Sequence, residues 1–223
     1  MLKEKNLKID IVSDVVCPWC YIGQERLNKA LKQSGLKAEI NWKPYQLNPN
    51  MPIEGADKFK FLEDKFGGSG KDMFKRVEDT AGAEGLAFKT ENIANIPNTI
   101  ESHRVMHLAK EKGLQNEMAD AFFKAYFVDG IDLTTTDGIL KVAVNGGLDK
   151  NEASTYLQSE KATNEVKATE QQYKVAGVSA VPTFIINDKY MIQGAQAPET
   201  FIDAFNQLEI KADESLECKD DFC

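Results

Sequence analysis

Two cysteines, Cys17 and Cys20, stand where an apolar run gives way to a helical pattern. At this spacing in the first turn of a helix the Cβ atoms lie roughly 5–6 Å apart, and rotamer changes can close the gap into a disulfide. Pro18 suits the first helical position, because its missing N–H costs no helical bond. The free N–H groups and the helix dipole favour an anion there, so we expect Cys17 to be a stabilised thiolate. These residue types predict reversible thiol–disulfide chemistry.

A strand followed by C-x-x-C and a helix is typical of a thioredoxin-like redox site. The alternatives are half of a zinc site or two buried thiols that happen to be close. A zinc site needs a second ligand pair of suitable geometry. Pro18 removes one N–H that would stabilise the thiolate and Trp19 adds no charge, so these residues do not decide between an oxidant and a reductant.

Length and composition limit the possibilities. At 223 residues the chain exceeds a minimal thioredoxin-like unit by about a hundred residues, so we expect an insertion. The net charge of −8 and the lack of a basic stripe argue against nucleic acid as a partner. No apolar run reaches about 18 residues, so no membrane span is expected.

The start of the chain bears on the compartment. Residues 1–6 are charged and run directly into a strand pattern, unlike the apolar segment of a signal peptide. We therefore expect a cytoplasmic protein. In a reducing compartment, four cysteines are more often catalytic than structural.

The elements around the cysteines form a β-α-β unit. Leu7–Ser13 alternates apolar and polar residues and predicts a strand, and a helix follows the C-x-x-C and ends near Gly35. Residues 37–47 predict a second strand, which must be parallel to the first if the crossover is right-handed.

From residue 57 to about 177 nearly every segment has helical periodicity, and seven helices are expected. Residues 177–186 and 189–193 then predict a hairpin, followed by a last helix. The predicted class is α/β, a thioredoxin-like fold with a large all-helical insertion. The predicted division is a thioredoxin-like domain of residues 1–52 and 178–210, a helical insertion of residues 53–177, and an acidic C-terminal tail of residues 211–223.

Three motifs support a family resemblance. The chain resembles the DsbA family of thiol–disulfide oxidoreductases, most closely its cytoplasmic FrnE-like branch, over essentially all residues up to Leu208. The first and third motifs together are specific, and either alone is weaker. The motifs are residues 13–23 (SDVVCPWCYIG), Asn98-Thr99 with His103-Arg104, and residues 178–184 (VSAVPTF) followed by Gln193-Gly194-Ala195.

Within this reading, Cys17 is the expected nucleophile, which attacks a substrate disulfide to give a mixed disulfide. Cys20, one turn deeper, is expected to resolve that intermediate. The resemblance implies a cis Val181–Pro182 bond that faces the C-x-x-C and leaves the Val181 backbone free to pair with an extended substrate. The alternative is an ordinary trans proline at the entry to a strand.

The resemblance also places Asn98, Thr99 and His103 on the face of the insertion towards the active site, which suggests a substrate groove. His103 and His107 are spaced i, i+4 on a predicted helix, a spacing that could hold a metal. The sequence offers no evident third ligand, so neither a metal nor another cofactor is expected.

The C-terminal tail carries Cys218 and Cys223. On a continuous helix this spacing turns the two side chains about 140° apart, so a disulfide between them needs a loop. The acidic neighbours Glu217, Asp220 and Asp221 raise thiol pKa values and slow nucleophilic attack. We hypothesise a second redox pair that relays electrons to or from Cys17 and Cys20, as the comparable C-x4-C of some FrnE-like proteins suggests. Idle thiols or a staple of the tail are the alternatives.

The predicted function is a thiol–disulfide oxidoreductase or isomerase that acts on disulfides of proteins or small thiols, with glutathione or a thioredoxin-type reductant as candidate electron partner. Three alternatives stay open. A glutathione-dependent isomerase or transferase of the kappa-like type shares the fold, but serine commonly occupies its nucleophile position. A chaperone-like binding module would not need the thiols. A zinc protein would use all four cysteines.

Overall fold

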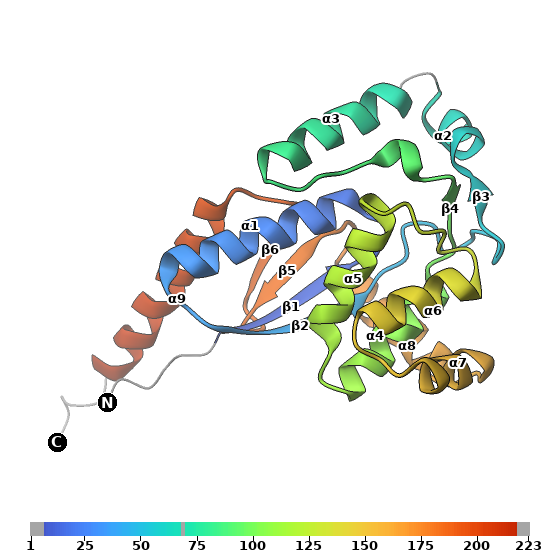
Figure 1. Cartoon of the computed structure of the whole chain (residues 1–223). Helices are drawn as coiled ribbons and strands as arrows, with labels where there is room; N and C mark the ends of the chain where they lie inside the picture. Colours follow the sequence, from blue (N-terminus) through green and yellow to red (C-terminus); the bar gives the residue numbers. More distant parts are fainter. Residues whose placement is uncertain (1–6, 68–69, 218–223) are drawn as a thin grey trace.

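The computed structural model describes residues 7–67 and 70–217. Strand β1 (Leu7–Ser13) lies inside a four-stranded sheet of order β2-β1-β5-β6 and pairs in parallel with β2 (Ala38–Pro44). Helix α1 (Pro18–Ser34) joins these two strands (Figure 1). The predicted β-α-β unit is confirmed.

The other half of the sheet comes from the C-terminal part of the chain. Strand β5 (Thr183–Ile186) is antiparallel to β1, and β6 (Tyr190–Gln193) is antiparallel to β5. Asn187 and Asp188 form the turn with positive φ angles of 51° and 57°, as a tight hairpin with the right-handed twist of the strands requires. Helix α9 (Pro198–Glu217) packs against α1 and includes part of the acidic tail.

The long segment between β2 and β5 is helical, as predicted. Two short strands within it were not predicted, because two residues carry no periodicity: β3 (Ala56–Asp57) and β4 (Asn95–Ile96) pair antiparallel. The helices are α2 (Lys58–Phe66), α3 (Gly70–Ala83), α4 (Ile100–Glu111), α5 (Gln115–Phe127), α6 (Thr136–Asn145), α7 (Lys150–Gln158) and α8 (Thr163–Val175), with a 3-10 turn at Thr90–Asn92.

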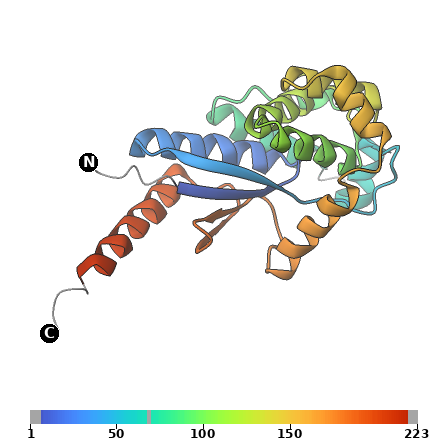
Figure 2. The same cartoon turned by 90° about the horizontal axis from the view of Figure 1, so that it is seen from below.

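The sheet has different neighbours on its two faces. Figure 2 shows α1 and α8 on opposite sides of β1 and β2. Ile9 and Ile11 belong to the apolar core that α1 and α9 share, whereas Asp10 between them accepts a hydrogen bond from Tyr173 of α8 at 2.8 Å. The alternation of side chains along a strand explains this separation.

A stack of aromatic rings joins the helical part to the helix that follows the cysteines. Tyr21, the residue after Cys20, stacks on Phe123 of α5 with ring centroids 5.1 Å apart and on Phe88 at 5.6 Å. Phe88 in turn stacks on Phe127 at 4.7 Å. These ring contacts fix α5 against the first turns of α1.

Helix α5 also covers the free edge of the sheet. The Gln115 side chain accepts a hydrogen bond from the Trp42 N–H at 3.0 Å and donates one to the Trp42 carbonyl at 3.1 Å. A side-chain amide thus takes the place of a further strand beside β2, which protects an edge that is otherwise open to pairing.

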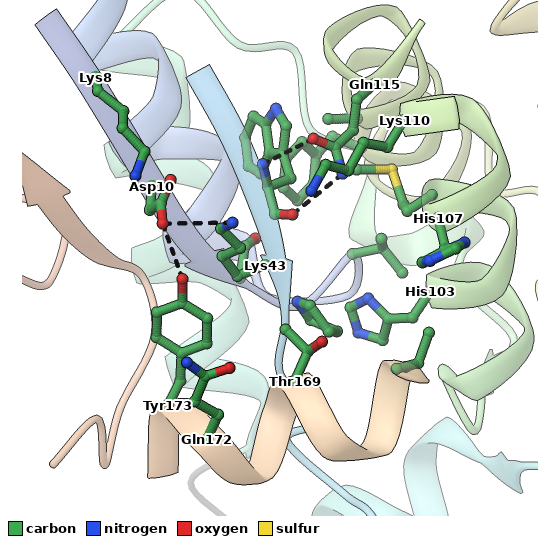
Figure 3. Close-up of a pocket in the computed structure, with 18 of the residues that line it drawn as sticks. Lys8, Asp10, Lys43, His103, His107, Lys110, Gln115, Thr169, Gln172 and Tyr173 are labelled. Atoms are coloured by element: carbon green, nitrogen blue, oxygen red, sulfur yellow. Dashed lines mark hydrogen bonds and ion pairs between the residues drawn. The ribbon is translucent and has the colours of Figure 1, made fainter. Parts of the chain in front are cut away.

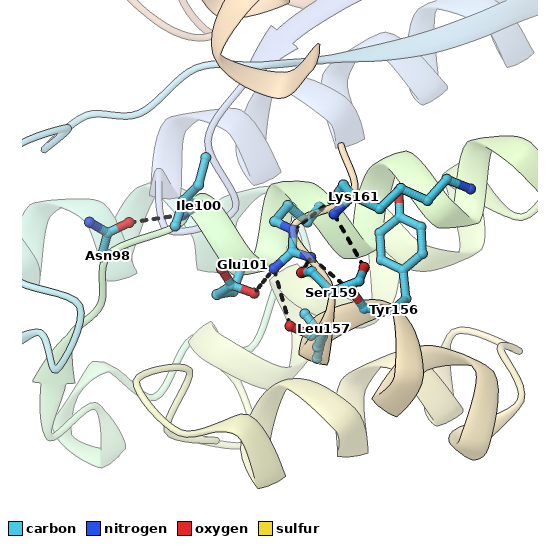
Figure 4. A network of polar contacts seen from close by, with 8 residues as sticks. Asn98, Ile100, Glu101, Tyr156, Leu157, Ser159 and Lys161 are labelled. Atoms are coloured by element: carbon cyan, nitrogen blue, oxygen red, sulfur yellow. Dashed lines mark hydrogen bonds and ion pairs between the residues drawn. The ribbon is translucent and has the colours of Figure 1, made fainter. Parts of the chain in front are cut away.

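Arg104 ties α4 to the segment between α7 and α8. Its buried guanidinium pairs with Glu101 at 2.6 Å, and Figure 4 labels Glu101 together with the residues whose carbonyls the guanidinium reaches. Buried charges need such partners, so this residue of the second motif has a structural task. The guanidinium also donates to the carbonyls of Tyr156, Leu157, Ser159 and Lys161.

Candidate active site

The two thiols lie at the start of α1. Cys17 is the residue before the first helical position and has an extended backbone, and Pro18 opens the helix as predicted. The exposed fraction of Cys17 is 3% and that of Cys20 is 0%, and both are free thiols. Cys17 therefore lies at the boundary of the core, with Cys20 behind it.

Trp19 is the exposed member of the motif, with 41% of its surface accessible. Pro18 and Val181 are partly buried. A ring held in solvent next to a nucleophile offers apolar contact to whatever molecule approaches it.

The Val181–Pro182 pair of the third motif faces Cys17 across the site. The Val181–Pro182 peptide is cis, as the resemblance implied, and Cys17 Sγ lies 3.7 Å from the Val181 carbonyl oxygen, to which the thiol can donate. Gly23 permits this arrangement, because a Cβ at that position would lie 3.0 Å from Phe184 Cζ and 3.1 Å from Pro182 Cγ. A glycine one turn after the cysteines thus lets α1 approach the Pro182 segment closely.

The chemistry of Cys20 differs from that of an exposed thiol. Burial raises the pKa of the Cys20 thiol well above its ordinary value, and the neighbouring Cys17 adds to the increase. The Ser13 hydroxyl and the Asp14 backbone act in the opposite direction. The Ser13 hydroxyl lies beside the Cys20 thiol without the geometry of a regular hydrogen bond. Cys20 is therefore protonated at rest.

Asp14 was not predicted as a site residue. Its carboxylate is 1% exposed and accepts a hydrogen bond from the Leu47 N–H at 2.8 Å. The Asp14 carbonyl accepts from the Cys17 N–H at 3.0 Å, so this residue holds the loop before the helix in two ways. The available signal was an acidic residue inside the apolar run three positions before Cys17.

The predicted groove residues lie where α4 meets the segment that follows β2. His103 is buried, with Nε2 3.1 Å from the Tyr45 carbonyl and 3.5 Å from Asp14 Oδ1. Thr99 is buried and stands at the start of α4 without a capping side-chain bond. Asn98 is partly buried and accepts from the Ile100 N–H at 3.0 Å. These contacts position α4 near Asp14, and a substrate-binding role for the three residues stays a prediction.

A metal site is not assembled in the part of the chain that the structure describes, where no three His, Cys, Asp or Glu side chains are placed to share an ion. His103 and His107 have separate partners, because His107 Nδ1 lies 3.0 Å from the Tyr156 hydroxyl. Within residues 7–67 and 70–217, no helix is long and apolar enough to cross a membrane. Cys218 and Cys223 lie outside the described residues.

Comparisons with known proteins match nearly the whole chain. The family model described as a DSBA-like thioredoxin domain matches residues 8–206. The crystal structure of the probable DsbA oxidoreductase SCO1869 from Streptomyces coelicolor is similar, with 31% identity, a TM-score of 0.83, and coverage of 91% of this chain and 89% of that one.

Two further relatives cover the same region. The Bacillus subtilis (strain 168) protein YwbO is 27% identical over 208 residues, which are 92% of this chain and 99% of that protein. The cytosolic disulfide reductase DsbM from Pseudomonas aeruginosa, solved with GSH, has the same fold at 16% identity, with a TM-score of 0.63 and coverage of 92% and 99%. The predicted fold is therefore confirmed along nearly the whole chain.

Proposed function

Because the chain belongs to the DSBA-like thioredoxin domain family, we propose that it is a thiol–disulfide oxidoreductase that works through Cys17 and Cys20. One observation carries the proposal. Cys17 begins α1 with its sulfur 3.7 Å from the Val181 carbonyl, and Cys20 lies one turn deeper in the core. A nucleophile at the boundary and a protected second thiol suit two successive exchange steps.

In the first step the Cys17 thiolate attacks one sulfur of a substrate disulfide. The substrate S–S bond breaks as the Cys17–substrate bond forms, and the other substrate sulfur leaves as a thiolate that takes up a proton. The thiolate, not the thiol, is the nucleophile in this exchange.

In the second step Cys20 loses its proton to water and attacks the Cys17 sulfur. The Cys17–Cys20 disulfide forms, the substrate thiol leaves, and the substrate has gained two electrons. The reverse sequence oxidises a dithiol, and the reduction potentials of the two pairs decide the direction. Reduction of further substrate requires a thiol donor, for which glutathione or a thioredoxin-type protein is our candidate.

A trapping experiment tests these roles. Cys20→Ser removes the second step, so incubation with oxidised glutathione or with a disulfide-linked peptide should leave a mixed disulfide on Cys17, detected by intact mass. Cys17→Ser should form no such adduct and should not reduce insulin. Insulin reduction by Cys17→Ser at the wild-type rate would contradict the proposal, and protection of a client from aggregation without any exchange would favour the chaperone-like alternative.

The kappa-like alternative has less support, because a cysteine stands at position 17 and a second thiol is present at position 20. We keep the relay through Cys218 and Cys223 as a separate proposal. Cys218→Ser/Cys223→Ser should lower the rate at which a reductant returns the oxidised protein to its reduced form. Unchanged turnover and an unchanged rate of this reduction would contradict the relay. The FrnE-like branch and the cytoplasmic location stay predictions.

A further inference from the structure

A cavity of about 400 Å³ lies on the α8 face of the sheet. Figure 3 shows its walls, with His107 and Lys110 on α4, Thr169 on α8, and Asp10 on β1. Neither Cys17 nor Cys20 lines it. This volume is within the range of small-molecule sites in proteins, so the cavity is large enough for a ligand.

The floor of the cavity is an ion pair between the two parallel strands. Lys43 Nζ on β2 lies 3.4 Å from Asp10 Oδ2 on β1, and the Tyr173 hydroxyl donates to the same oxygen at 2.8 Å. Asp10 is 5% exposed and the Lys43 side chain 16%. Both charges are therefore largely removed from bulk water, although the cavity opens beside them.

The second carboxylate oxygen of Asp10 has no partner. Asp10 Oδ1 is buried and makes no hydrogen bond within the described residues. Buried carboxylate oxygens are normally paired, and an unmade bond of this kind costs about 1–3 kcal/mol. Asp10 lines the cavity, but Oδ1 itself is closed to solvent, so a donor that enters from there meets the Asp10–Lys43 pair rather than this oxygen.

The charges of the floor select one kind of ligand. A simple anion would meet Asp10 next to Lys43, and a simple cation would meet Lys43 next to Asp10. A zwitterion avoids both conflicts, because its ammonium group can donate to Asp10 while its carboxylate accepts from Lys43. An α-amino acid carries these two groups on one carbon, which matches a pair of opposite charges 3.4 Å apart.

The residues that line the cavity beside the ion pair determine which side chain the ligand can carry. Met106 of α4 and Val166 of α8 are buried residues that line the cavity. An apolar side chain placed against them leaves water, which is favourable. The lining also holds His107, Lys110 and Thr169, so the preference for an apolar side chain rests on the contact with Met106 and Val166.

We infer that this cavity binds a free α-amino acid with an apolar side chain, held by Asp10 and Lys43 and covered by α4 and α8. The inference goes beyond the proposed redox function and does not depend on it, because binding here involves neither thiol. A failed test of amino-acid binding would leave the proposed redox function unaffected, and a failed test of the redox function would leave amino-acid binding unaffected.

Calorimetry on the full chain, reduced and oxidised, tests the inference with L-leucine, L-methionine and L-phenylalanine as probes. At least one should bind, and N-acetyl-L-leucine and L-leucinamide, which lack the ammonium or the carboxylate, should bind about tenfold to a hundredfold more weakly than L-leucine. Equal binding of both derivatives, or no binding of any of the three amino acids, would overturn the inference.

Variants of the chain locate the site. Asp10→Asn should weaken binding of L-leucine at least about tenfold, since the ammonium loses its charged partner. Thr169→Phe fills the cavity without touching the ion pair and should abolish binding, which keeps the test decisive where Asp10→Asn fails to fold. Asp129→Asn, on the exposed Lys124–Asp129 pair outside the cavity, is the matched control and should bind as the wild type does. Wild-type affinity in Thr169→Phe would also overturn the inference.

Discussion

On the α1 side of β1, Ile9 and Ile11 are fully buried in close-packed apolar surroundings, whereas on the α8 side Asp10 borders a cavity. The α1 side continues into Phe184 of β5, which meets Phe201 of α9 edge to face at 4.9 Å. Side chains on this side leave little free space, and Gly23 is the point of closest approach. Close packing of apolar side chains therefore fixes the positions of the two thiols.

The α8 side depends on polar contacts instead. Lys43 and Tyr173 both reach Asp10 Oδ2, and the opposite oxygen of Asp10 is left without a partner among the described residues. Close packing suits a site whose two sulfur atoms must meet in one geometry, and an open, charged space suits a site that receives a molecule. One sheet can therefore support a closely packed thiol site on one face and an open, charged cavity on the other when the side chains of the two faces differ.

Truncation of one large side chain on each face should give the largest difference in the free energy of unfolding between the two faces. Phe184→Ala removes a fully buried ring between α1 and α9 and should lower the free energy of unfolding by about 3–5 kcal/mol. Met106→Ala, in the wall of the cavity, should cost only about 2 kcal/mol, because the side chain already borders free space. Urea unfolding of the reduced proteins measures both values, and equal losses would show that the two faces are packed alike.

A single methyl group tests how closely α1 approaches the Pro182 segment. Gly23→Ala places a carbon 3.0 Å from Phe184 Cζ and 3.1 Å from Pro182 Cγ, so we expect a loss of about 1–2 kcal/mol and slower exchange as Pro182 is displaced from Cys17. Unfolding and insulin reduction report the two effects.

Gly82→Ala is the matched control, because a Cβ at that helical glycine of α3 meets no atom within 4 Å. This substitution should raise the free energy of unfolding by up to about 1 kcal/mol and leave exchange unchanged. Similar behaviour of the two alanine variants would contradict the close approach at Gly23.

The raised pKa of Cys20 predicts a pH dependence of stability. Because burial keeps this thiol protonated in the folded state, the folded protein binds more protons than the unfolded chain once the pH exceeds the ordinary thiol pKa. Stability is then complete below that value and falls as the pH rises towards the folded pKa, by at most about 1.4 kcal/mol per pH unit.

Urea unfolding of reduced Cys17→Ser across this alkaline range measures the slope without the neighbouring thiol. The matched control is Cys17→Ser/Cys20→Ser, which should lack the dependence. Equal slopes in the two proteins would contradict a buried, protonated Cys20.

The sequence predicted the thiol face far better than the cavity face, and the reason is physical. Cys17, Pro18 and Cys20 act through contacts within one helical turn, so their spacing alone indicates chemistry. Asp10 and Lys43 meet only because β1 and β2 pair in one register, and Tyr173 joins them from a distant helix. Such contacts between distant segments leave no periodic signal. The two-residue strands β3 and β4 were not predicted, because they are too short to show an alternation of apolar and polar residues.

Ser13 is where the two faces meet, and it should give the smallest effect. Ser13 lines the cavity, and its buried hydroxyl lies beside the Cys20 thiol without a regular hydrogen bond within the described residues. Ser13→Ala should therefore change the free energy of unfolding by no more than about 1 kcal/mol, since little bonding is lost. It should also extend the alkaline loss of stability to higher pH, because the loss begins at the ordinary thiol pKa and ends at the folded pKa of Cys20, which the hydroxyl lowers. An unchanged pH profile with unchanged amino-acid binding would show that the two faces act independently, whereas a shifted profile would identify Ser13 as the link between them.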